Sequence, residues 1–518
     1  MTRKTVVVFT CVLAAILGPL AGCAAAATNL LAEAKWQYSV DGGKSWTAAD
    51  APPALTKETR ATILARAELT AGDLAKVVCW ELDAGGGYGQ RISHQLNGKP
   101  VPVPLEGMEY RTIGAIPAET IQAGKNVLTV KVEYQGKRAG GRPLRLPKTL
   151  IALTEQDLKI VSGPVLGAIT NNAFTVTCRT NMPATVTMSR FTPAGSPPDT
   201  LTPIPTTSKG LFHRFASLSY GTGPRKYQLV VRRGEKTIYV RGTVRLPAAG
   251  DKLRLVVLGD SRSNPPTWRK MSELAMAAKP DLVLHSGDLV KYGRSDWQWN
   301  EQLFGPAKEM FAWIPFYAVR GNHEAKAPLY AKLFFGPGPK GDPIQWSQEL
   351  NGVLLIGIEA EADWSADSGN AKWLEKLLAG SQAKFIFLMS HYPAWTSGTH
   401  GKLGPDGRPR EKPIRQGQDV IVPLLAKYKA TAMFAGHDHL YERSELPGGL
   451  THVVSGGAGA PLRGKVAGAD EQNPHSKAFA SKLHFCLIEA AGDTCTLRAL
   501  TPGGEEIDRR TWSARPSP

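Results

Sequence analysis

Cysteine is scarce in this chain, which has six cysteines among 518 residues. No two of them stand in the C-x-x-C spacing of a thiolate metal site, so that class of site is excluded. Cys486 and Cys495 flank a short turn, and a cross-strand disulfide between them is one alternative. Buried free thiols are the favoured interpretation for these two residues and for Cys79 and Cys178.

Aromatic residues are also few, at 8% of the chain, and they are not interleaved with the basic residues. No nucleic-acid-binding motif is present, so a nucleic acid is excluded as a partner. The formal net charge is +17, and residues 23–250 carry 28 basic and 16 acidic side chains, against 32 and 29 in residues 251–518. This basic first half predicts contact with an anionic envelope polymer or lipid headgroups, with a solvated surface as the alternative.

Long apolar runs are missing except at the start of the chain, where residues 5–20 are apolar and follow two basic residues. This run is too short to span a bilayer, and small residues follow it, so residues 1–22 are predicted to be an export signal peptide. The tetrapeptide LAGC that ends at Cys23 resembles the bacterial lipobox. It implies a lipid anchor on Cys23. The anchored protein would then lie in the cell envelope, in the periplasm or at the cell surface. The alternative is ordinary cleavage near residues 25–27 and a secreted protein.

The chain is long enough for several domains, because a single hydrophobic core rarely serves 518 residues. Residues 28–150 alternate apolar and polar residues between turn signals, which predicts an N-terminal β-sandwich. The segments Leu96–Lys99 and Gly124–Val132 resemble parts of the jelly rolls of galactose-binding-like domains. Binding of a sugar polymer and a role as a spacer are both consistent with this resemblance, and the spacer is favoured because nothing fixes a sugar site.

A second β-rich region is predicted over residues 155–248. Its apolar segments include Phe174–Cys178 and Lys226–Val231, and a proline-rich loop lies between them. The order of these segments resembles a fibronectin type III or immunoglobulin-like sandwich. The first half of the chain is therefore predicted to contain two β-sandwiches in tandem.

From residue 251 to residue 518 the pattern changes to strands that alternate with helices. Apolar runs such as Leu253–Leu258 and Lys384–Met389 predict buried strands, and Thr267–Ala278 predicts a helix with one apolar face. Alternation of this kind predicts a layered α/β domain whose ligands gather at the carboxyl ends of the strands. Nine of the 11 histidines lie in this region, so it is the place to look for a metal site.

Clusters of Asp, Asn and His follow five of the predicted strands. Buried carboxylates need a partner, and a metal ion is the simplest one. The clusters are Gly259-Asp260, Gly287-Asp288, Gly321-Asn322-His323-Glu324, Ser390-His391 and Gly436-His437-Asp438-His439.

Together these clusters resemble the calcineurin-like metallophosphoesterase superfamily, and the segment Gly436–Arg443 is especially similar to its purple acid phosphatase branch. The resemblance covers about half of the chain. It implies a four-layer α/β domain that hydrolyses phosphate mono- or diesters with two metal ions (Fe, Zn, Mn or similar) and a hydroxide held between them. The implied ligands are Asp260 and His439 for the first ion, Asn322, His391 and His437 for the second, and Asp288 for both.

Other residues complete the site that the resemblance implies. His323 is the candidate that protonates or hydrogen-bonds the leaving oxygen, with a purely supporting role as the alternative. Glu324 is expected to support the ligands without touching an ion. Arg443 and His400 are candidates for the substrate cleft, with ordinary surface positions as the alternative.

One position departs from the superfamily pattern. The common motif has a histidine two residues after the first Asp, where this chain has Arg262, and a guanidinium stays protonated and cannot bind a metal. Purple acid phosphatases also lack this histidine and use a tyrosine three residues after the shared Asp. Tyr292 stands four residues after Asp288 and is a weak ligand candidate, so the first ion is expected to be weakly held. Our hypothesis for Arg262 is that it clamps a phosphate oxygen.

Two functions therefore remain open at the level of sequence. The favoured one is an exported, acid-phosphatase-like phosphoesterase. The alternative is a metal-poor, non-catalytic envelope-binding protein that uses the phosphoesterase fold as a scaffold. Arg262 favours the alternative, whereas Asn322, His323 and the ligand histidines favour the enzyme.

Overall fold

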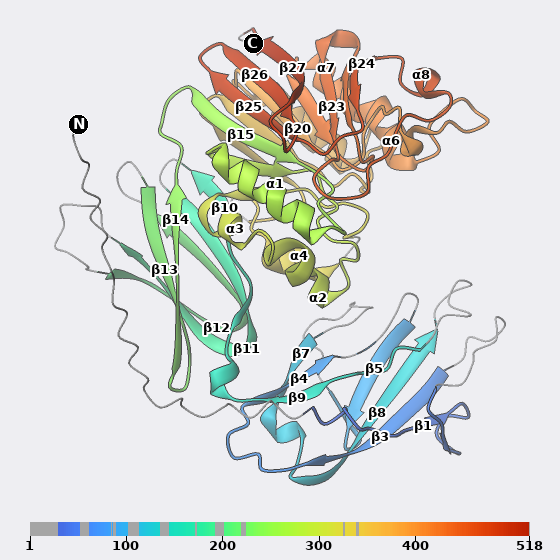
Figure 1. The fold of residues 1–518 in the computed structure, drawn as a ribbon. Helices are drawn as coiled ribbons and strands as arrows, with labels where there is room; N and C mark the ends of the chain where they lie inside the picture. Colours follow the sequence, from blue (N-terminus) through green and yellow to red (C-terminus); the bar gives the residue numbers. More distant parts are fainter. Residues whose placement is uncertain are drawn as a thin grey trace, which may run out of the picture.

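The computed structural model describes residues 29–51, 62–83, 85, 90–101, 113–134, 144–170, 173–191, 201–218, 224–324, 327–337 and 341–516. The predicted export signal and Cys23 lie outside these residues and stay predictions. Among the described residues, no helix has the length and apolar character needed to cross a bilayer. The described chain is rich in sheet, and three regions follow one another along it (Figure 1).

The first region consists of two sheets that share one core. Strand β3 buries every second residue, from Ile63 to Leu69, and these side chains pack with Trp80 and Leu82 of β4 in the opposite sheet. This is a β-sandwich, and its jelly-roll, galactose-binding-like type stays a prediction. The larger sheet has the order β2(Thr47–Ala48), β1(Trp36–Ser39), β3(Thr62–Ala71), β8(Gly124–Tyr134), β5(Gln90–Leu96), β6(Lys99–Pro100), and the smaller has β7(Ile113–Pro117), β4(Cys79–Asp83), β9(Leu150–Leu153).

The second region is a five-stranded antiparallel sheet built along one long strand. The first half of β11 pairs with β10 and its second half pairs with β13, while β12 follows it along the other edge. The region is β-rich as predicted, and its fibronectin type stays a prediction. The strands are β10(Ile160–Thr170), β11(Ala173–Phe191), β12(Leu201–Leu218), β13(Pro224–Arg233) and β14(Lys236–Arg245).

This sheet is attached to the C-terminal region by buried polar contacts. The guanidinium of Arg179 forms a bidentate ion pair with Asp296, and the hydrogen bond from Nη2 to Oδ2 measures 2.7 Å. The hydroxyl of Tyr227 donates to the carbonyl oxygen of Ala312 at 2.9 Å. Both carboxylate and guanidinium are buried, so removing either partner would leave an uncompensated charge.

The C-terminal region has four layers, with two sheets face to face and helices on both outer faces. Leu255 and Val257 of β15 point to the core between the sheets, while Val256 and Leu258 pack against Trp268 of α1. The same alternation occurs in β20, whose outer residues pack against α5 and α7. The first sheet has the order β17(Phe316–Ala318), β16(Leu282–His285), β15(Lys252–Leu258), β25(Phe485–Ala491), β26(Thr494–Leu500), β27(Glu506–Ser513). The second has β18(Trp346–Leu350), β19(Val353–Gly357), β20(Phe385–Met389), β21(Ala432–Ala435), β23(Thr451–Ser455), β22(Tyr441–Glu445), β24(Ser476–Ala480).

Helices of this region alternate with strands along the chain, as the sequence predicts. Helix α1 begins after Asn264, whose side chain accepts a hydrogen bond from the backbone of Thr267, and α5 begins after Ser368 in the same way. The helices are α1(Pro265–Ala277), α2(Asp296–Gln298), α3(Lys308–Trp313), α4(Pro328–Leu333), α5(Gly369–Gly380), α6(Lys412–Gln416), α7(Val422–Lys427) and α8(Ala469–Gln472), with π-helical turns η3(Trp299–Phe304) and η5(Gly417–Ile421).

The parallel pairing decides where the polar clusters meet. Strands β15, β16 and β17 are parallel to one another in the first sheet, and β19, β20, β21 and β23 are parallel in the second. Their carboxyl ends therefore lie at one edge of each sheet. The residues that follow these strands are the ones that the sequence predicts to bind metal.

The cross-strand disulfide that the sequence left as an alternative is wrong. Cys486 lies opposite Ala499 and Cys495 lies opposite Ala490, so the two thiols belong to different pairs of the β25–β26 hairpin. All four described cysteines are free and buried. The favoured interpretation of buried thiols is confirmed for these residues.

Candidate metal centre

Three residues of the site have a backbone conformation that side chains rarely adopt. Asp260 and Asp288 have φ of 57° and His437 has φ of 71°, and each directly follows a glycine at the end of a strand. Strained positions of this kind are kept where the surrounding structure holds them for a function. At Gly436, a Cβ atom would lie 2.3 Å from Oδ2 of Asp260, so only glycine allows this approach.

Four side chains converge on one point from four different strand ends. Nε2 of His391 lies 3.0 Å from Oδ1 of Asn322, 3.2 Å from Nδ1 of His437 and 3.3 Å from Oδ1 of Asp288. His391 and Asp288 are fully buried or nearly so. We call Asp288, Asn322, His391 and His437 the four-donor set.

The protons of this set point away from its centre. Nδ1 of His391 donates to the carbonyl oxygen of Ser286 at 2.8 Å, and Nε2 of His437 donates to Oε2 of Glu411 at 2.9 Å. In neutral rings, Nε2 of His391 and Nδ1 of His437 therefore carry lone pairs, and both face oxygen or nitrogen acceptors. Acceptors that face one another without a proton repel, and a cation between them removes this cost. The donor set fits a metal ion with oxygen and imidazole preference, such as Zn, Fe or Mn.

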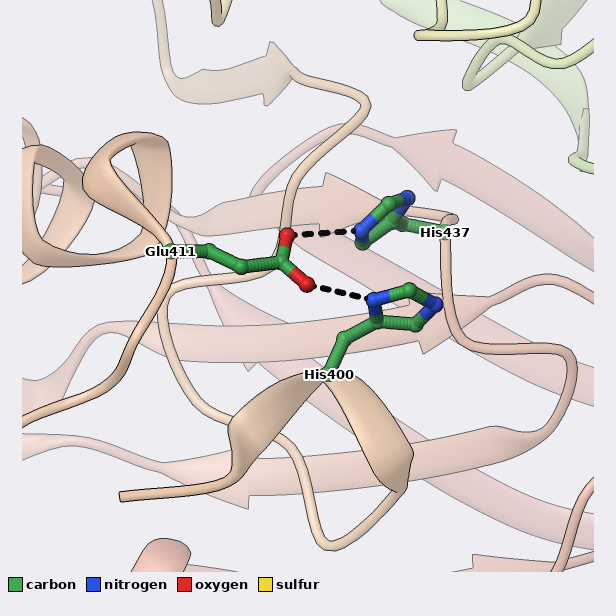
Figure 2. A group of neighbouring side chains, drawn as sticks. All are labelled: His400, Glu411 and His437. Carbon is green, nitrogen blue, oxygen red and sulfur yellow. Dashed lines mark hydrogen bonds and ion pairs between the residues drawn. The ribbon is translucent and has the colours of Figure 1, made fainter. Parts of the chain in front are cut away.

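Glu411 is a functional residue that sequence reasoning missed. Its two oxygens accept hydrogen bonds from His437 and from Nδ1 of His400 (Figure 2). Burial alone would raise the pKa of Glu411, but the bonds from His400 and His437 outweigh it and lower this pKa to about 2. Glu411 precedes α6 at the end of a loop without periodicity, so no signal in the sequence points to it.

His400 is held beside His437 by the loop that carries it. Its ring centroid lies 3.7 Å from that of His437, and its backbone N–H donates to Oδ2 of Asp438 at 3.2 Å. Another residue of the loop, Ser397, donates from both its N–H and its hydroxyl to buried Glu442. The structure therefore places His400 against His437, and a substrate-cleft role for His400 stays a prediction.

Beside the four-donor set lies a second group, which we call the three-donor set: Asp260, Asp288 and His439. Nε2 of His439 lies 3.6 Å from Oδ1 of Asp260. Oδ1 of Asp260 is buried and has no hydrogen-bond partner among the described residues. Burial and the charge of Asp288 raise the pKa of Asp260, whereas burial lowers the pKa of His439 to about 3.

Arg262 lies within this three-donor set. Its Nε donates to Oδ2 of Asp288 at 3.1 Å and its Nη2 to Nε2 of His439 at 3.2 Å. The residue is only 9% exposed. The guanidinium therefore uses lone pairs that the first ion would need, and weak binding of that ion stays a prediction.

His323 and Glu324 follow Asn322 in the chain and take different positions. Nδ1 of His323 donates to the carbonyl oxygen of Lys291 at 2.6 Å, which directs Nε2 toward Asp288, 3.8 Å from Oδ2. Burial lowers the pKa of His323 below its ordinary value. Glu324 is fully buried and accepts from three backbone N–H groups of the strand-end loops, and burial together with the Asp288 charge raises its pKa to about 8.

Tyr292 and Arg443, two further candidates for the site, differ from the other predicted residues in exposure or in their hydrogen-bond partners. Tyr292 is 38% exposed, while the other proposed histidine and aspartate ligands are at most 5% exposed. Arg443 donates from Nε and Nη2 to Asp508 and from Nη1 to Glu445, so it links β22 to β27 of the opposite sheet. A ligand role for Tyr292 and a cleft role for Arg443 stay predictions.

Comparison with known proteins identifies this region. Residues 253–441 match the family described as calcineurin-like phosphoesterase. Tartrate-resistant acid phosphatase type 5 of Homo sapiens is 33% identical over 169 residues, which cover 28% of this chain and 49% of that protein. Probable inactive purple acid phosphatase 27 of Arabidopsis thaliana is 26% identical over 220 residues, or 35% of each protein. This chain thus spans half or less of the length of these curated relatives.

Solved structures agree on the fold. A purple acid phosphatase from yellow lupin (Lupinus luteus) seeds has a TM-score of 0.58 at 15% identity, over 93% of this chain and 96% of that one. The structure of PhoD has a TM-score of 0.51 at 12% identity, over 68% and 90%. At these identities the likeness concerns the fold alone. Residues 253–441 are therefore a calcineurin-like metallophosphoesterase domain with purple acid phosphatases among its relatives.

Proposed function

We propose that this protein is a metal-dependent phosphoric ester hydrolase that acts on phosphate mono- or diesters. The observation that carries the proposal is the four-donor set, in which the amide oxygen of Asn322, Oδ1 of Asp288 and Nδ1 of His437 all lie within 3.3 Å of Nε2 of His391. A cation bound there supplies Lewis acidity and makes water a nucleophile at neutral or acidic pH. The sequence resemblance implies a second ion, which Asp260, Asp288 and His439 would hold and which would add further Lewis acidity.

The chain's own residues supply orientation and a proton. Ser286 and Glu411 fix the proton positions of His391 and His437, so both rings present a lone pair without reorganising. His323 has a ring that is 25% exposed and an Nε2 atom close to Asp288. Protonated at that atom, it donates a hydrogen bond or its proton to the leaving oxygen of the ester.

The alternative is a non-catalytic binding protein on the same scaffold. Arg262 within the three-donor set favours it. Two relatives from Arabidopsis thaliana are also named probable inactive purple acid phosphatases. In this alternative the β-sandwiches of the N-terminal half bind an anionic or sugar polymer of the envelope, and the metal content of the purified protein is low.

One experiment separates the two functions. Purified protein is loaded with Mn, Zn or Fe, and hydrolysis of a p-nitrophenyl phosphate monoester and diester is measured beside Asn322→Ala. The enzyme predicts turnover that disappears together with bound metal in Asn322→Ala, because the amide oxygen is a ligand. Absence of turnover with every metal, in protein that is folded, contradicts the enzyme and leaves the binding protein.

A further inference from the structure

Arg262 occupies the lone pairs that a second ion requires. Nδ1 of His439 donates to the carbonyl oxygen of Pro461 at 2.7 Å, so its Nε2 carries a lone pair, and this lone pair accepts from Nη2 of Arg262. Oδ2 of Asp288 accepts from Nε of the same guanidinium. Two of the three residues of the three-donor set are therefore already bound to a permanent cation.

Both the backbone and the guanidinium of Arg262 have hydrogen bonds that hold the residue in this position. The backbone N–H of Arg262 donates to the carbonyl oxygen of Asp288 at 3.3 Å, and Nη1 donates to the hydroxyl of Ser263 at 3.4 Å. The side chain is 11% exposed, which leaves little room for it to turn into solvent. An ion at the three-donor set would lie next to a charge of the same sign in a buried place, where repulsion is strong.

The charge balance of the centre points the same way. Asp260 and Asp288 are the two carboxylates of the combined sets, and Arg262 neutralises one of them. One divalent ion at the four-donor set then brings the buried group close to neutrality. A second divalent ion would leave a surplus of three positive charges on these residues, or of two once the Glu411 carboxylate that bonds His437 is counted, and the interior does not stabilise such a surplus without further anions.

We propose that Arg262 takes the place of the second metal ion, so that each chain holds one divalent cation at the four-donor set. The guanidinium then supplies the second fixed positive charge between Asp288 and His439. It has five N–H groups, of which three have the acceptors named above, so N–H groups remain for a phosphate oxygen. This last role rests on the proposed phosphoesterase function, whereas the number of ions per chain does not.

The number of ions per chain tests the proposal. Full-length protein is stripped with a chelator, equilibrated with excess Mn(II), freed of unbound ion and analysed by elemental analysis and by electron paramagnetic resonance. We expect one ion per chain and the spectrum of an isolated Mn(II) ion. Arg262→His replaces the cation by a ligand and is expected to give two ions and an exchange-coupled spectrum. Arg262→Lys keeps the charge and is expected to give one.

A matched control variant and a second substitution complete the design. Arg443→His removes another arginine that is paired with carboxylates and has a similar side-chain exposure, 13% against 11%, and it is expected to leave one ion. Should Arg262→His not fold, Arg262→Ala still predicts a second, weaker ion at high Mn(II). Two coupled ions in the wild type overturn the proposal, as does a single ion in both Arg262→His and Arg262→Ala. One ion without any turnover leaves this inference standing and contradicts the proposed function.

Discussion

Nε2 of His391 and Nδ1 of His437 lie 3.2 Å apart, and each ring gives its only neutral-form proton to another acceptor. Two lone pairs therefore face each other inside the protein. A shared proton or a cation removes the repulsion between them, and the nearby oxygens of Asn322 and Asp288 make a cation the better match. This pair of rings is therefore the centre of the proposed metal site.

Glu411 is expected to set the affinity for the ion through His437. Glu411→Ala removes the acceptor of the His437 Nε2 proton, so the ring no longer holds its lone pair at Nδ1, and affinity for Zn(II) should fall about 10- to 100-fold. Competition with a fluorescent chelator measures this affinity. Glu361→Ala is the control. Glu361 accepts from the hydroxyl of Tyr392, whereas Glu411 accepts from the rings of His400 and His437. Equal affinities in both variants would show that Glu411 does not set the tautomer.

The ion should stay bound in acid. Metal binds neutral imidazole, and burial lowers the pKa of His437 to about 3. Protons therefore compete with the ion at His437 only as the pH falls toward 3. A histidine with the ordinary pKa of 6.5 would begin to exchange the ion for a proton near pH 6.5. Ion content measured by equilibrium dialysis should be equal at pH 7 and pH 5. Loss of half the ion near pH 6 would mean that His437 is not a buried neutral ligand.

His323 should matter most for esters with poor leaving groups. As a proton donor it is active in its protonated form, and burial lowers its pKa, so the rate should decline as the pH rises through a value below the ordinary 6.5. His323→Ala should slow hydrolysis of an alkyl phosphate by about 100-fold. It should slow p-nitrophenyl phosphate far less, because that leaving group needs no proton. Equal losses on both esters would indicate a supporting role only.

Cys23 is expected to carry the lipid that keeps the protein at a membrane. In the native host, Cys23→Ala should move the protein from the membrane fraction to the soluble fraction and abolish labelling by a fatty-acid probe, because each buried methylene of an acyl chain contributes about 0.8 kcal/mol. Cys79→Ala is the control, since this thiol is buried in the fold. A soluble, unlabelled wild-type protein would favour ordinary cleavage and secretion.

The strand-end clusters could be predicted because two independent signals coincide there. Runs such as Val353–Ile358 are apolar on both faces, which is typical of parallel strands buried between layers, and the residues after such strands must meet at one edge. The chemical type of Asp260, Asp288, His391 and His437 then indicated a cation. The structure adds that ligand atoms of Asp260, Asp288 and His391 lie within 4.8 Å of one another, and that Nδ1 of His437 lies 3.2 Å from Nε2 of His391.

The parts that were missed depend on side-chain packing that has no period in the sequence. Glu411 lies in a loop, and only the path of that loop past His437 makes it a partner of the ring. The position of Arg262 between Asp288 and His439 depends in the same way on one rotamer. The 19-residue strand β11, which changes partner halfway along its length, was likewise not visible in the alternation of its residues.

The most direct test is a crystal structure of protein loaded with Zn(II), with anomalous scattering recorded at the zinc edge. The account predicts one strong anomalous peak about 2.0–2.1 Å from Nε2 of His391 and Nδ1 of His437, with oxygens of Asn322 and Asp288 completing the coordination. It also predicts the guanidinium of Arg262 beside Asp288 and His439. The absence of a peak between the two rings in zinc-loaded crystals would contradict it.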